Sequence, residues 1–576
     1  MRRFFLKLLL VLLIPATCLA QNGTKPIVTS DVMKLATADQ IDISPDGTRA
    51  VMVVTRKAVR KEKEYYYTRH LYMVNLSGGE PVQLTFGDRN DGQPTWSPDG
   101  KNIAFVRRDG DASQIWILPV GGGEAYAFTK VKSGTSQPVW SPDGKKILFS
   151  SNIPAHDISG APGWANERPG RAYNDEPNWL GMKDDEKKNV KSSPDGSLEE
   201  IRAWLAKNAS EKNPRVLNRL QFQGENDLQP EMRFSHLFVV PFTEGAEAKQ
   251  ITNGFQSFSS PAWSPDGAKI ICTSESPSVE PDANRKNSVW LMNADGSELK
   301  EFISFPEYPA LGAQYSPDGK SILFLTRSGQ DFLRGQFELA LMPATGGKHT
   351  TLTDDFDRDV SSPIWAADGK SIYFTASADG DIPLYNISTK GGKPTAVIGN
   401  DKGVMDYDVS GDKIVFAQTE IISPWDVYTL NTKDKKTTQL TRLNESWLKE
   451  KKVITPKEYW ITRPDGVKVQ YWVMEPVNRK DGVKYPTILN IHGGPTAMWG
   501  PSGFSMWHEF QMQVGWGYGL VFCNPRGSRG YGEDFKRGNF KDWGTGPAND
   551  ILAALDDATA KHNWIDKDQY FVTGGS

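Results

Sequence analysis

The chain has 576 residues, of which 38% are hydrophobic and 24% are charged, and its formal net charge is −3. A chain of this length is too long for one ordinary domain, so we expect two or more globular domains. The near balance of acidic and basic residues argues against a nucleic-acid partner and against attachment to an anionic membrane surface.

Residues 1–20 are predicted to be a signal peptide that is cleaved after Ala20. Arg2 and Arg3 stand before the apolar run 8–14, as in a secretory leader. The arginine pair resembles a twin-arginine export motif, but the short leader and its apolar core favour ordinary secretion. No later segment reaches about eighteen uninterrupted apolar residues, so we expect no stable membrane insertion of the mature chain. The predicted location is secreted or periplasmic.

A tetrapeptide, Ser-Pro-Asp-Gly, recurs along most of the chain. It begins at Ser44, Ser97, Ser141, Ser264 and Ser316, and looser copies stand at 366–369 and 410–412. Proline presets φ, aspartate caps the turn and glycine accepts a positive φ, so each copy predicts a strand, a tight turn and a second strand. Each copy is followed by another predicted pair of strands. These seven four-strand units, most of them 44 to 53 residues apart, predict a seven-bladed β-propeller over 21–443.

The third unit carries a polar insertion at about 153–234. It contains one predicted helix, 198–207, and a further Ser-Pro-Asp-Gly at Ser193 that has no aromatic residue before it and no strand after it. We interpret this copy as a turn that begins the helix, not as an eighth blade.

Residues 444–576 have a different pattern, which predicts a second domain. A hairpin around 464–466 is followed by apolar strands at 486–491 and 519–523, a helix that begins near Pro547, and a strand at 570–573. Alternating strands and helices of this kind predict a parallel sheet that is covered by helices. On the helix, one apolar face is expected to hold Ile551, Leu552, Leu555 and Ala558.

Two loops of this second domain carry chemistry. Gly574-Gly575-Ser576 follows a strand, as does the first part of the Gly-x-Ser-x-Gly turn that lifts a serine nucleophile above an α/β-hydrolase sheet. His492-Gly493-Gly494-Pro495 follows an earlier strand, and such a loop supplies a backbone N–H to an oxyanion hole. Ser576 is therefore the predicted nucleophile.

The histidines are predicted to be non-catalytic, because in α/β-hydrolases the order is Ser, Asp or Glu, then His, and all seven histidines precede Ser576. We expect His492 to orient its loop. Arg526 is expected either to pair with a carboxylate or to hold its own loop, and the second role is favoured. No motif indicates a metal or a cofactor.

Together these residues resemble the prolyl oligopeptidase family of serine peptidases, and most closely its acylaminoacyl peptidase and bacterial dipeptidyl peptidase branch. The matching segments are His492-Gly493-Gly494-Pro495, Asn524-Pro525-Arg526-Gly527-Ser528, Trp543-Gly544 and Thr573-Gly574-Gly575-Ser576. The resemblance implies a seven-bladed propeller followed by an α/β-hydrolase domain, with Ser576 as nucleophile and Gly494 as the upstream oxyanion donor. It also implies that the triad Asp and His lie beyond Ser576, so that the hydrolase domain printed here is incomplete at its C-terminus.

The resemblance further implies a secreted enzyme that hydrolyses oligopeptides by acyl transfer and releases dipeptides or N-acyl amino acids from the N-terminus. Arg526, Glu225 and Glu231 are candidate substrate-binding residues. Two alternatives stay open: an esterase on the same hydrolase scaffold, and a propeller that serves as a binding scaffold beside a catalytically dead domain. The pattern leaves the oligomeric state open.

Overall fold

The structure is a computed structural model of the chain. It describes residues 23–61, 64–110, 112–162, 165, 190–210, 217, 219–224, 228–229, 231–327, 335–399, 401–494, 496–502 and 506–575. The predicted signal peptide with Ala20, the candidate Glu225 and the predicted nucleophile Ser576 lie outside these residues. None of the helices described is long and apolar enough to cross a membrane.

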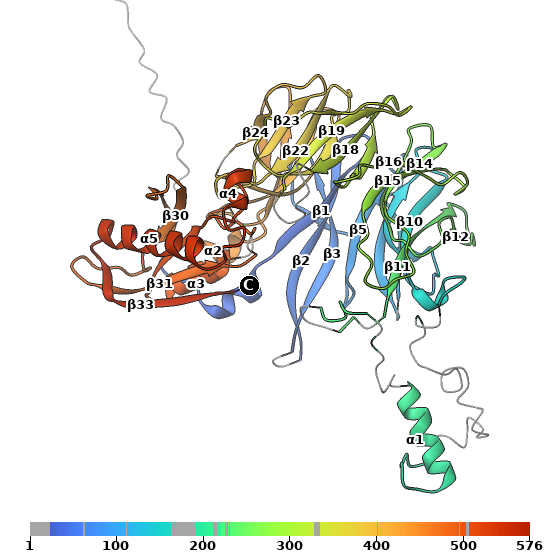
Figure 1. Cartoon of the computed structure of the whole chain (residues 1–576), viewed down its shortest axis with the longest axis horizontal. Helices are drawn as coiled ribbons and strands as arrows, with labels where there is room; N and C mark the ends of the chain where they lie inside the picture. Colours follow the sequence, from blue (N-terminus) through green and yellow to red (C-terminus); the bar gives the residue numbers. More distant parts are fainter. Residues whose placement is uncertain are drawn as a thin grey trace, which may run out of the picture.

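Seven four-stranded antiparallel sheets form the first domain, which confirms the seven predicted blades (Figure 1). The first three blades contain β1 (Thr37–Ile43), β2 (Arg49–Lys61), β3 (Glu64–Asn75) and β4 (Val82–Gln83); β5 (Asp91–Trp96), β6 (Asn102–Asp109), β7 (Ala112–Pro119) and β8 (Tyr126–Ala127); and β9 (Ser136–Trp140), β10 (Lys146–Pro154), β11 (Arg233–Pro241) and β12 (Lys249–Gln250).

The remaining four blades follow in chain order. They contain β13 (Phe258–Trp263), β14 (Lys269–Glu275), β15 (Asn287–Asn293) and β16 (Lys300–Ile303); β17 (Leu311–Tyr315), β18 (Ser321–Arg327), β19 (Phe337–Pro343) and β20 (Thr350–Thr351); β21 (Val360–Trp365), β22 (Ser371–Ala376), β23 (Leu384–Ser388) and β24 (Thr395–Ile398); and β25 (Gly403–Ser410), β26 (Lys413–Thr419), β27 (Asp426–Asn431) and β28 (Thr437–Gln439).

The repeated tetrapeptide forms the turn between the first two strands of a blade. In the first copy the N–H of Gly47 donates to Ser44 O at 2.8 Å, and Gly47 has a φ of +66°. Asp46 accepts from the N–H of Thr48 at 3.0 Å and from the Ser44 hydroxyl. A positive φ strains residues with a Cβ, so glycine is favoured at this position. The turn chemistry expected from the sequence is therefore the chemistry that sets the blade hairpins.

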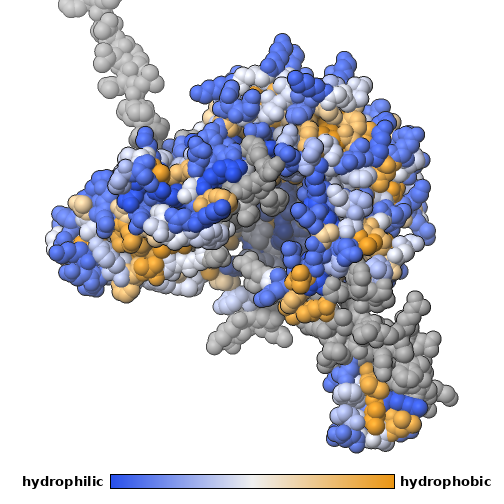
Figure 2. All heavy atoms as spheres, viewed as in Figure 1, coloured by the Kyte–Doolittle hydropathy of each residue, from blue (hydrophilic) through white to orange (hydrophobic). Residues whose placement is uncertain are grey.

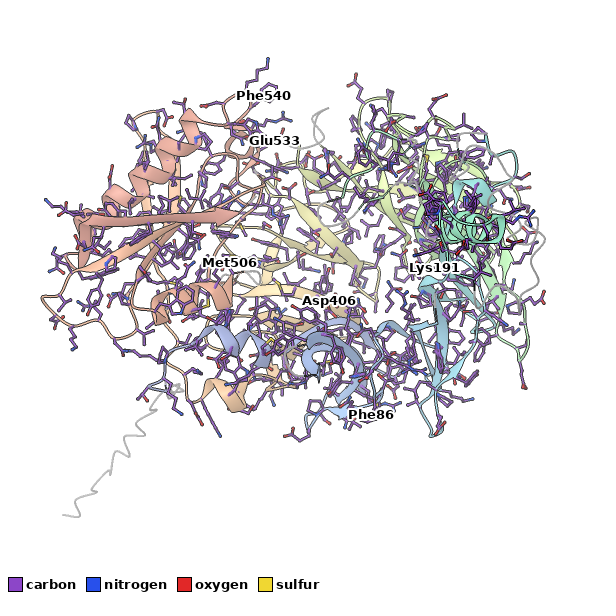
Figure 3. The ribbon with its side chains drawn as sticks, turned by 90° about the horizontal axis from the view of Figure 1, so that it is seen from below. Phe86, Lys191, Asp406, Met506, Glu533 and Phe540 are labelled. Atoms are coloured by element: carbon purple, nitrogen blue, oxygen red, sulfur yellow. The ribbon has the colours of Figure 1, made fainter. Side chains whose placement is uncertain are left out.

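Side chains on the first strands connect neighbouring blades. The N–H of Gln93 donates to Gln40 Oε1 at 2.6 Å, and the N–H of Gln137 donates in the same way to Gln93 Oε1 at 2.6 Å. Between the last and first blades, Asp406 and Asp408 replace the glutamines. Asp406 accepts from the N–H of Ile41 at 2.8 Å, and Asp408 accepts from the N–H of Ile43 at 2.8 Å. No strand is shared between the first and last blades, which are joined by these hydrogen bonds and by a shared apolar cluster that includes Ala50, Val415 and Val427. Figure 3 labels Asp406 at this junction.

This junction gathers partly buried carboxyl groups. Burial raises the pKa of Asp406 to about 6, and the Asp39 charge adds to the rise, while backbone N–H groups oppose it. Burial likewise raises the pKa of Asp408 to about 6 and that of Asp42 well above its usual value. Burying a carboxylate without a cation beside it costs free energy, so the environment of this junction stabilises the protonated form of these acids relative to the ionised form.

The insertion of the third blade lies between β10 and β11. It contains a short 3₁₀ helix, η2 (Ala155–Asp157), and the helix α1 (Leu198–Ser210), so the helix predicted at 198–207 is confirmed and extends slightly further. Ser197 and Glu200 cap it reciprocally: the Glu200 N–H donates to Ser197 Oγ at 3.3 Å, and the Ser197 N–H donates to Glu200 Oε2 at 2.8 Å. Apolar side chains are exposed on α1, and Leu198 is 59% exposed. Figure 2 shows orange, hydrophobic spheres on this helix.

Two segments run side by side between the propeller and the second domain. The N-terminal segment before β1 contains η1 (Thr29–Lys34), and the segment that links β28 to β29 contains α2 (Glu445–Leu448). The buried Asn444 holds them together, since its Oδ1 accepts from the Ala36 N–H and its Nδ2 donates to Ala36 O, both at 2.8 Å.

The second domain is built on a five-stranded sheet with the order β29-β30-β32-β31-β33. Its strands are β29 (Lys457–Thr462), β30 (Lys468–Met474), β31 (Tyr485–His492), β32 (Gly519–Asn524) and β33 (Ile565–Gly575). The predicted hairpin is β29–β30. The sheet is only partly parallel: β31 runs parallel to β32 and β33, whereas β30 is antiparallel to β32.

Helices cover both faces of this sheet (Figure 1). The helices are α3 (Trp507–Gly515), α4 (Glu533–Arg537) and α5 (Thr545–Lys561). α5 buries Ile551, Leu555 and Ala558 against one face, and α3 packs on the other with Phe510 and Val514. The expectation that Leu552 shares the buried face is wrong, because this side chain is 53% exposed. Position 552 lies about 100° around the helix from Ile551 and about 60° from Leu555, at the border of the buried stripe.

Replacing Asp406 with asparagine should stabilise the propeller at alkaline pH. The pKa of Asp406 is about 6 in the folded chain and 3.8 in the reference state, so the folded chain binds an extra proton between these values and stability falls as pH rises through this window. We expect Asp406→Asn to raise the free energy of unfolding by about 1–3 kcal/mol at pH 8 and to change it little at pH 4. Thermal unfolding at both pH values measures the difference. An equal effect at both would show that the buried charge is not the cause.

Candidate active site

The predicted nucleophile strand and the predicted oxyanion loop meet at one edge of the sheet. β31 and β33 pair in parallel, with Ile491 opposite Gly574 and His492 opposite Gly575. Ser576 follows Gly575 directly, and Gly493 follows His492. The chain therefore delivers both chemistry-bearing loops to the same carboxyl edge of the sheet, side by side.

A glycine at 574 is required by this pairing. A Cβ there would lie 2.1 Å from Ile491 O, and carbonyl oxygens of a neighbouring strand cannot yield that far. At Gly575 a Cβ would meet no atom of the described chain within 4 Å. Among the described residues, only the first of these two glycines thus has a neighbour that excludes a Cβ.

Gly494 forms a tight turn directly after β31. Its φ is +128°, and a Cβ would lie 2.6 Å from Ala497 N and 2.8 Å from Thr496 N. No L-residue with a side chain fits this position without moving the following backbone. Glycine at 494 therefore allows the chain to fold back closely onto residues 496 and 497.

His492 is buried and bridges two loops. Its Nδ1 lies 2.9 Å from Gly493 O, and its Nε2 lies 3.1 Å from Ser528 Oγ. Burial lowers the pKa of His492, which favours the neutral ring. In the neutral form, Nδ1–H donates to Gly493 O and Nε2 is an acceptor that faces the Ser528 hydroxyl, whose single proton also has the nearer acceptor Pro525 O at 2.7 Å. These are the contacts of a residue that orients its own loop.

The next residues of the loop are held by the end of β32. Asn524 Oδ1 accepts from the N–H of Trp499 at 2.9 Å, and Asn524 Nδ2 donates to Trp499 O at 2.7 Å. Trp499 in turn packs edge-on against the His492 ring, with centroids 5.4 Å apart. The side-chain amide of Asn524 thus pairs with both backbone groups of Trp499, as the backbone of a neighbouring β-strand would.

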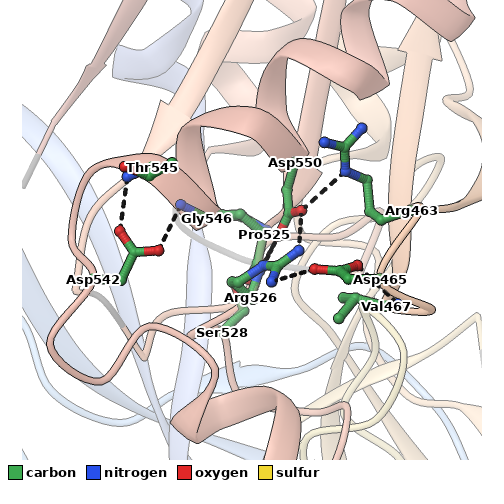
Figure 4. A network of polar contacts seen from close by, with 10 residues as sticks. All are labelled: Arg463, Asp465, Val467, Pro525, Arg526, Ser528, Asp542, Thr545, Gly546 and Asp550. Carbon is green, nitrogen blue, oxygen red and sulfur yellow. Dashed lines mark hydrogen bonds and ion pairs between the residues drawn. The ribbon is translucent and has the colours of Figure 1, made fainter.

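Arg526 lies in an ion-pair network around the buried Asp550 (Figure 4). Its Nε and one Nη each contact a different oxygen of Asp550 at 2.8 Å, and its other Nη lies 2.8 Å from Asp465 Oδ2. Asp550 is fully buried and also lies 3.4 Å from Arg463 Nε. The pair with Asp550 raises the pKa of Arg526 further above its usual value. Arg526 therefore pairs with carboxylates, the alternative that the sequence did not favour, and these pairs anchor its loop to α5 and to the β29–β30 turn. They give no support to the prediction of Arg526 as a substrate-binding residue.

The candidate carboxylate Glu231 is also engaged. Its Oε2 lies 2.6 Å from Arg233 Nη1, and its Oε1 lies 3.3 Å from His156 Nδ1. Both partners belong to the third blade and its insertion. Glu231 therefore has a local cationic partner that any substrate amine would have to displace.

Several residues of this region carry roles that the sequence did not indicate. Ser528 belongs to the segment 524–528, which resembles the prolyl oligopeptidase family, but its contact with His492 depends on two loops that meet only in the folded chain. Asp381 of the propeller contacts Ser502 of the loop after β31, and no local pattern marks either residue.

Both buried cysteines, Cys272 and Cys523, are free thiols.

Two family profiles match the chain. The TolB beta propeller domain matches residues 27–158 and 245–473, and the prolyl oligopeptidase family matches residues 503–576. Among curated proteins, the uncharacterized peptidase YuxL of Bacillus subtilis is 28% identical over 96% of this chain and 78% of its own length. Dipeptidyl-peptidase 5 of Porphyromonas gingivalis is 25% identical over 94% of this chain and 74% of its own.

Solved structures show the same architecture. Pyrococcus horikoshii acylaminoacyl peptidase matches with a TM-score of 0.70 and 21% identity, over 94% of this chain and 74% of that one. A Mycobacterium tuberculosis puromycin-hydrolyzing peptidase matches with a TM-score of 0.64 and 16% identity, over 96% and 76% of the two chains.

The propeller, the α/β-hydrolase sheet and these matches define the class of protein, a serine peptidase whose hydrolase domain is joined to a seven-bladed propeller. Within that class, the chain belongs to the prolyl oligopeptidase family.

Replacing Arg526 with lysine should destabilise the second domain. A lysine cannot make the two parallel contacts with Asp550, so a fully buried carboxylate loses much of its compensation. We expect the free energy of unfolding to fall by about 2–4 kcal/mol. Arg479→Lys is the matched control, because Arg479 pairs with Glu475 at a more exposed site and should lose less than about 1 kcal/mol. Denaturant unfolding of both variants measures this, and equal losses would contradict the assigned role.

The two glycines before Ser576 should differ in their tolerance of a methyl group. Gly574→Ala places a Cβ against Ile491 O and should part β31 from β33, with a loss of about 1–3 kcal/mol in unfolding free energy. Gly575→Ala meets no such contact and should cost less than about 1 kcal/mol. Thermal unfolding of the two variants compares them directly, and an equally large loss at Gly575 would contradict the register assigned to β33.

Proposed function

We propose that this serine peptidase is secreted and cleaves short peptides by acyl transfer, with Ser576 as the nucleophile. The observation that carries the proposal is the register of β31 and β33, in which His492 pairs with Gly575. This pairing brings the residue after Gly575 to the edge where the Gly494 turn begins. A nucleophile and an oxyanion donor have to share one edge in this way.

In the proposed mechanism, Ser576 Oγ attacks the scissile carbonyl carbon and passes its proton to a histidine that an aspartate orients. The chain order of α/β-hydrolases places both partners after Ser576. The carbonyl oxygen becomes an oxyanion, which the N–H of Gly494 and that of the residue after Ser576 stabilise. The histidine then protonates the leaving amine, and water hydrolyses the acyl-enzyme. Each oxyanion donor contributes roughly a hundred- to a thousandfold in rate.

We propose release of dipeptides or N-acyl amino acids from the N-terminus of the substrate. The support is the likeness to proteins named dipeptidyl-peptidase 5 and to structures named acylaminoacyl peptidase. For localisation, the support is the predicted signal peptide 1–20, with its basic start and apolar run. Secretion predicts a mature N-terminus at Gln21. N-terminal sequencing of the exported protein checks this, and an intact Met1 there would contradict it.

The nucleophile is tested with the full-length enzyme and a fluorophosphonate probe, which attaches to activated serines. We expect rapid labelling of the wild type and none of Ser576→Ala, because the probe needs both the nucleophile and the oxyanion site. Ser193→Ala, in the turn before α1, is the matched control and should label like the wild type.

Turnover of dipeptidyl, N-acyl-aminoacyl and fatty-ester chromogenic substrates then separates the substrate classes. Hydrolysis of the first or second class by the wild type, and its loss in Ser576→Ala, supports the proposal. Turnover of fatty esters alone would favour the esterase alternative, and labelling of Ser576→Ala at the wild-type rate would exclude Ser576 as the nucleophile.

A further inference from the structure

The loop that begins with Gly494 continues across the boundary between the two domains. Residues 498–502 lie between the end of β32 in the hydrolase domain and the loop 377–383, which connects β22 to β23 in the sixth blade. The hydrolase side holds the loop through Asn524 and Trp499, as described above. The propeller side holds it through different contacts, which start one residue later.

A buried hydrogen bond joins the loop to the propeller. The hydroxyl of Ser502 donates to Asp381 Oδ1 at 2.6 Å, and the two residues are only 1% and 7% exposed. The other carboxylate oxygen of Asp381 accepts from the N–H of Asp401 at 2.8 Å. Ser502 thus contacts a side chain that the propeller itself holds in place. Such a charge-assisted bond, shielded from water, is stronger and more directional than one at the surface.

Backbone contact at glycines surrounds this bond. A Cβ on Gly500 would lie 1.9 Å from Gly380 O, and a Cβ on Gly403 of the seventh blade would lie 2.3 Å from Ser502 O. The loop and the propeller therefore touch main chain to main chain on both sides of Ser502. A shift of the propeller loop would have to move residues 500–502 with it.

The same propeller loop also contacts the loop that follows β32. The N–H of Asp379 donates to Gly530 O at 3.1 Å, two residues after the Ser528 that binds His492. A Cβ on Gly530 would lie 2.4 Å from Met498 Sδ. One short segment of the sixth blade thus reaches both loops that surround His492.

The ionised form of Asp381 suits this role at neutral pH. Burial raises its pKa to about 6, and the carboxylates of Asp401 and Glu458 add to the rise, while the bonds from Ser502 and from the Asp401 N–H oppose it. Above pH 6 both carboxylate oxygens are therefore free to accept these two bonds.

We propose that Asp381 is a positioning residue for catalysis: through Ser502 it fixes the loop that presents the Gly494 N–H, so the propeller supplies part of the geometry of the oxyanion hole. Asp381 does not touch the substrate in this scheme. It acts by limiting the motion of residues 496–502, and an oxyanion donor that is displaced by about 1 Å loses much of its effect. The inference rests on the proposed function, since it assigns the oxyanion role to Gly494.

The test uses the full-length enzyme with Asp381→Ala, Ser502→Ala and the double variant. If the Ser502–Asp381 bond positions the loop, each single variant should lower kcat at least tenfold and change KM less than threefold, because the oxyanion forms only in the transition state. The double variant should be no worse than the worse single variant. Asp381→Asn keeps an acceptor for the Ser502 hydroxyl and should recover part of the lost rate.

The matched control is Asp359→Asn, which breaks another contact between the domains. Asp359 Oδ2 lies 2.7 Å from Lys536 Nζ of α4, away from the loop that begins with Gly494. We expect its kcat to stay within twofold of the wild type, even if its melting temperature falls. Melting temperatures of all variants show whether each one is folded at the assay temperature.

The outcomes separate the two proposals. If the wild type neither reacts with the fluorophosphonate probe nor hydrolyses peptides, the proposed function fails. If the wild type is active but Asp381→Ala and Ser502→Ala lower kcat no more than Asp359→Asn does, or raise KM alone, the positioning role is overturned and the proposed function stands. Additive losses in the double variant would also contradict a role through one shared bond.

Discussion

The parallel pairing of β31 with β33 is the constraint on which the functional part of the molecule depends. The two strands are more than seventy residues apart in the chain, and only their register places the Gly494 turn beside the end of the strand that leads to Ser576. That register requires a residue without a side chain at 574, where the neighbouring carbonyl leaves no room for a Cβ. Backbone packing therefore fixes the relative position of the two loops, independently of the catalytic side chains.

Buried polar groups and close backbone contacts connect the loops around this pairing, beyond the apolar cores on the two faces of the sheet. His492 links two loops as a neutral ring, and Asn524 substitutes for a strand partner beside Trp499. Glycines then allow the hydrolase loops to touch the sixth and seventh blades directly. Groups of this kind tolerate little displacement, because a buried donor or acceptor that loses its partner is costly. The rigidity of the site thus comes from many short polar contacts that span both domains.

The features that the sequence predicts correctly are those with a local cause. The turn at Ser44, the capped helix at Leu198 and the hairpin before Lys468 each depend on neighbours within a few residues, and repetition makes the blade count readable. The insertion of β32 between β30 and β31, the exposure of Leu552 and the contacts of Ser528 and Asp381 depend on segments far apart in the chain. Arg526 shows the same limit, since its motif indicates a special position but only the fold reveals that Asp550 and Asp465 share its guanidinium.

The closure of the propeller has a mechanical consequence. The first and last blades share no strand, and the side chains of Asp406 and Asp408 join them at the same place where Asn444 ties the two interdomain connections together. None of the seven blade junctions has a β-ladder between the described strands, but this is the junction from which both segments leave toward the second domain. A load applied between the two domains therefore acts directly on the side-chain contacts that close the ring.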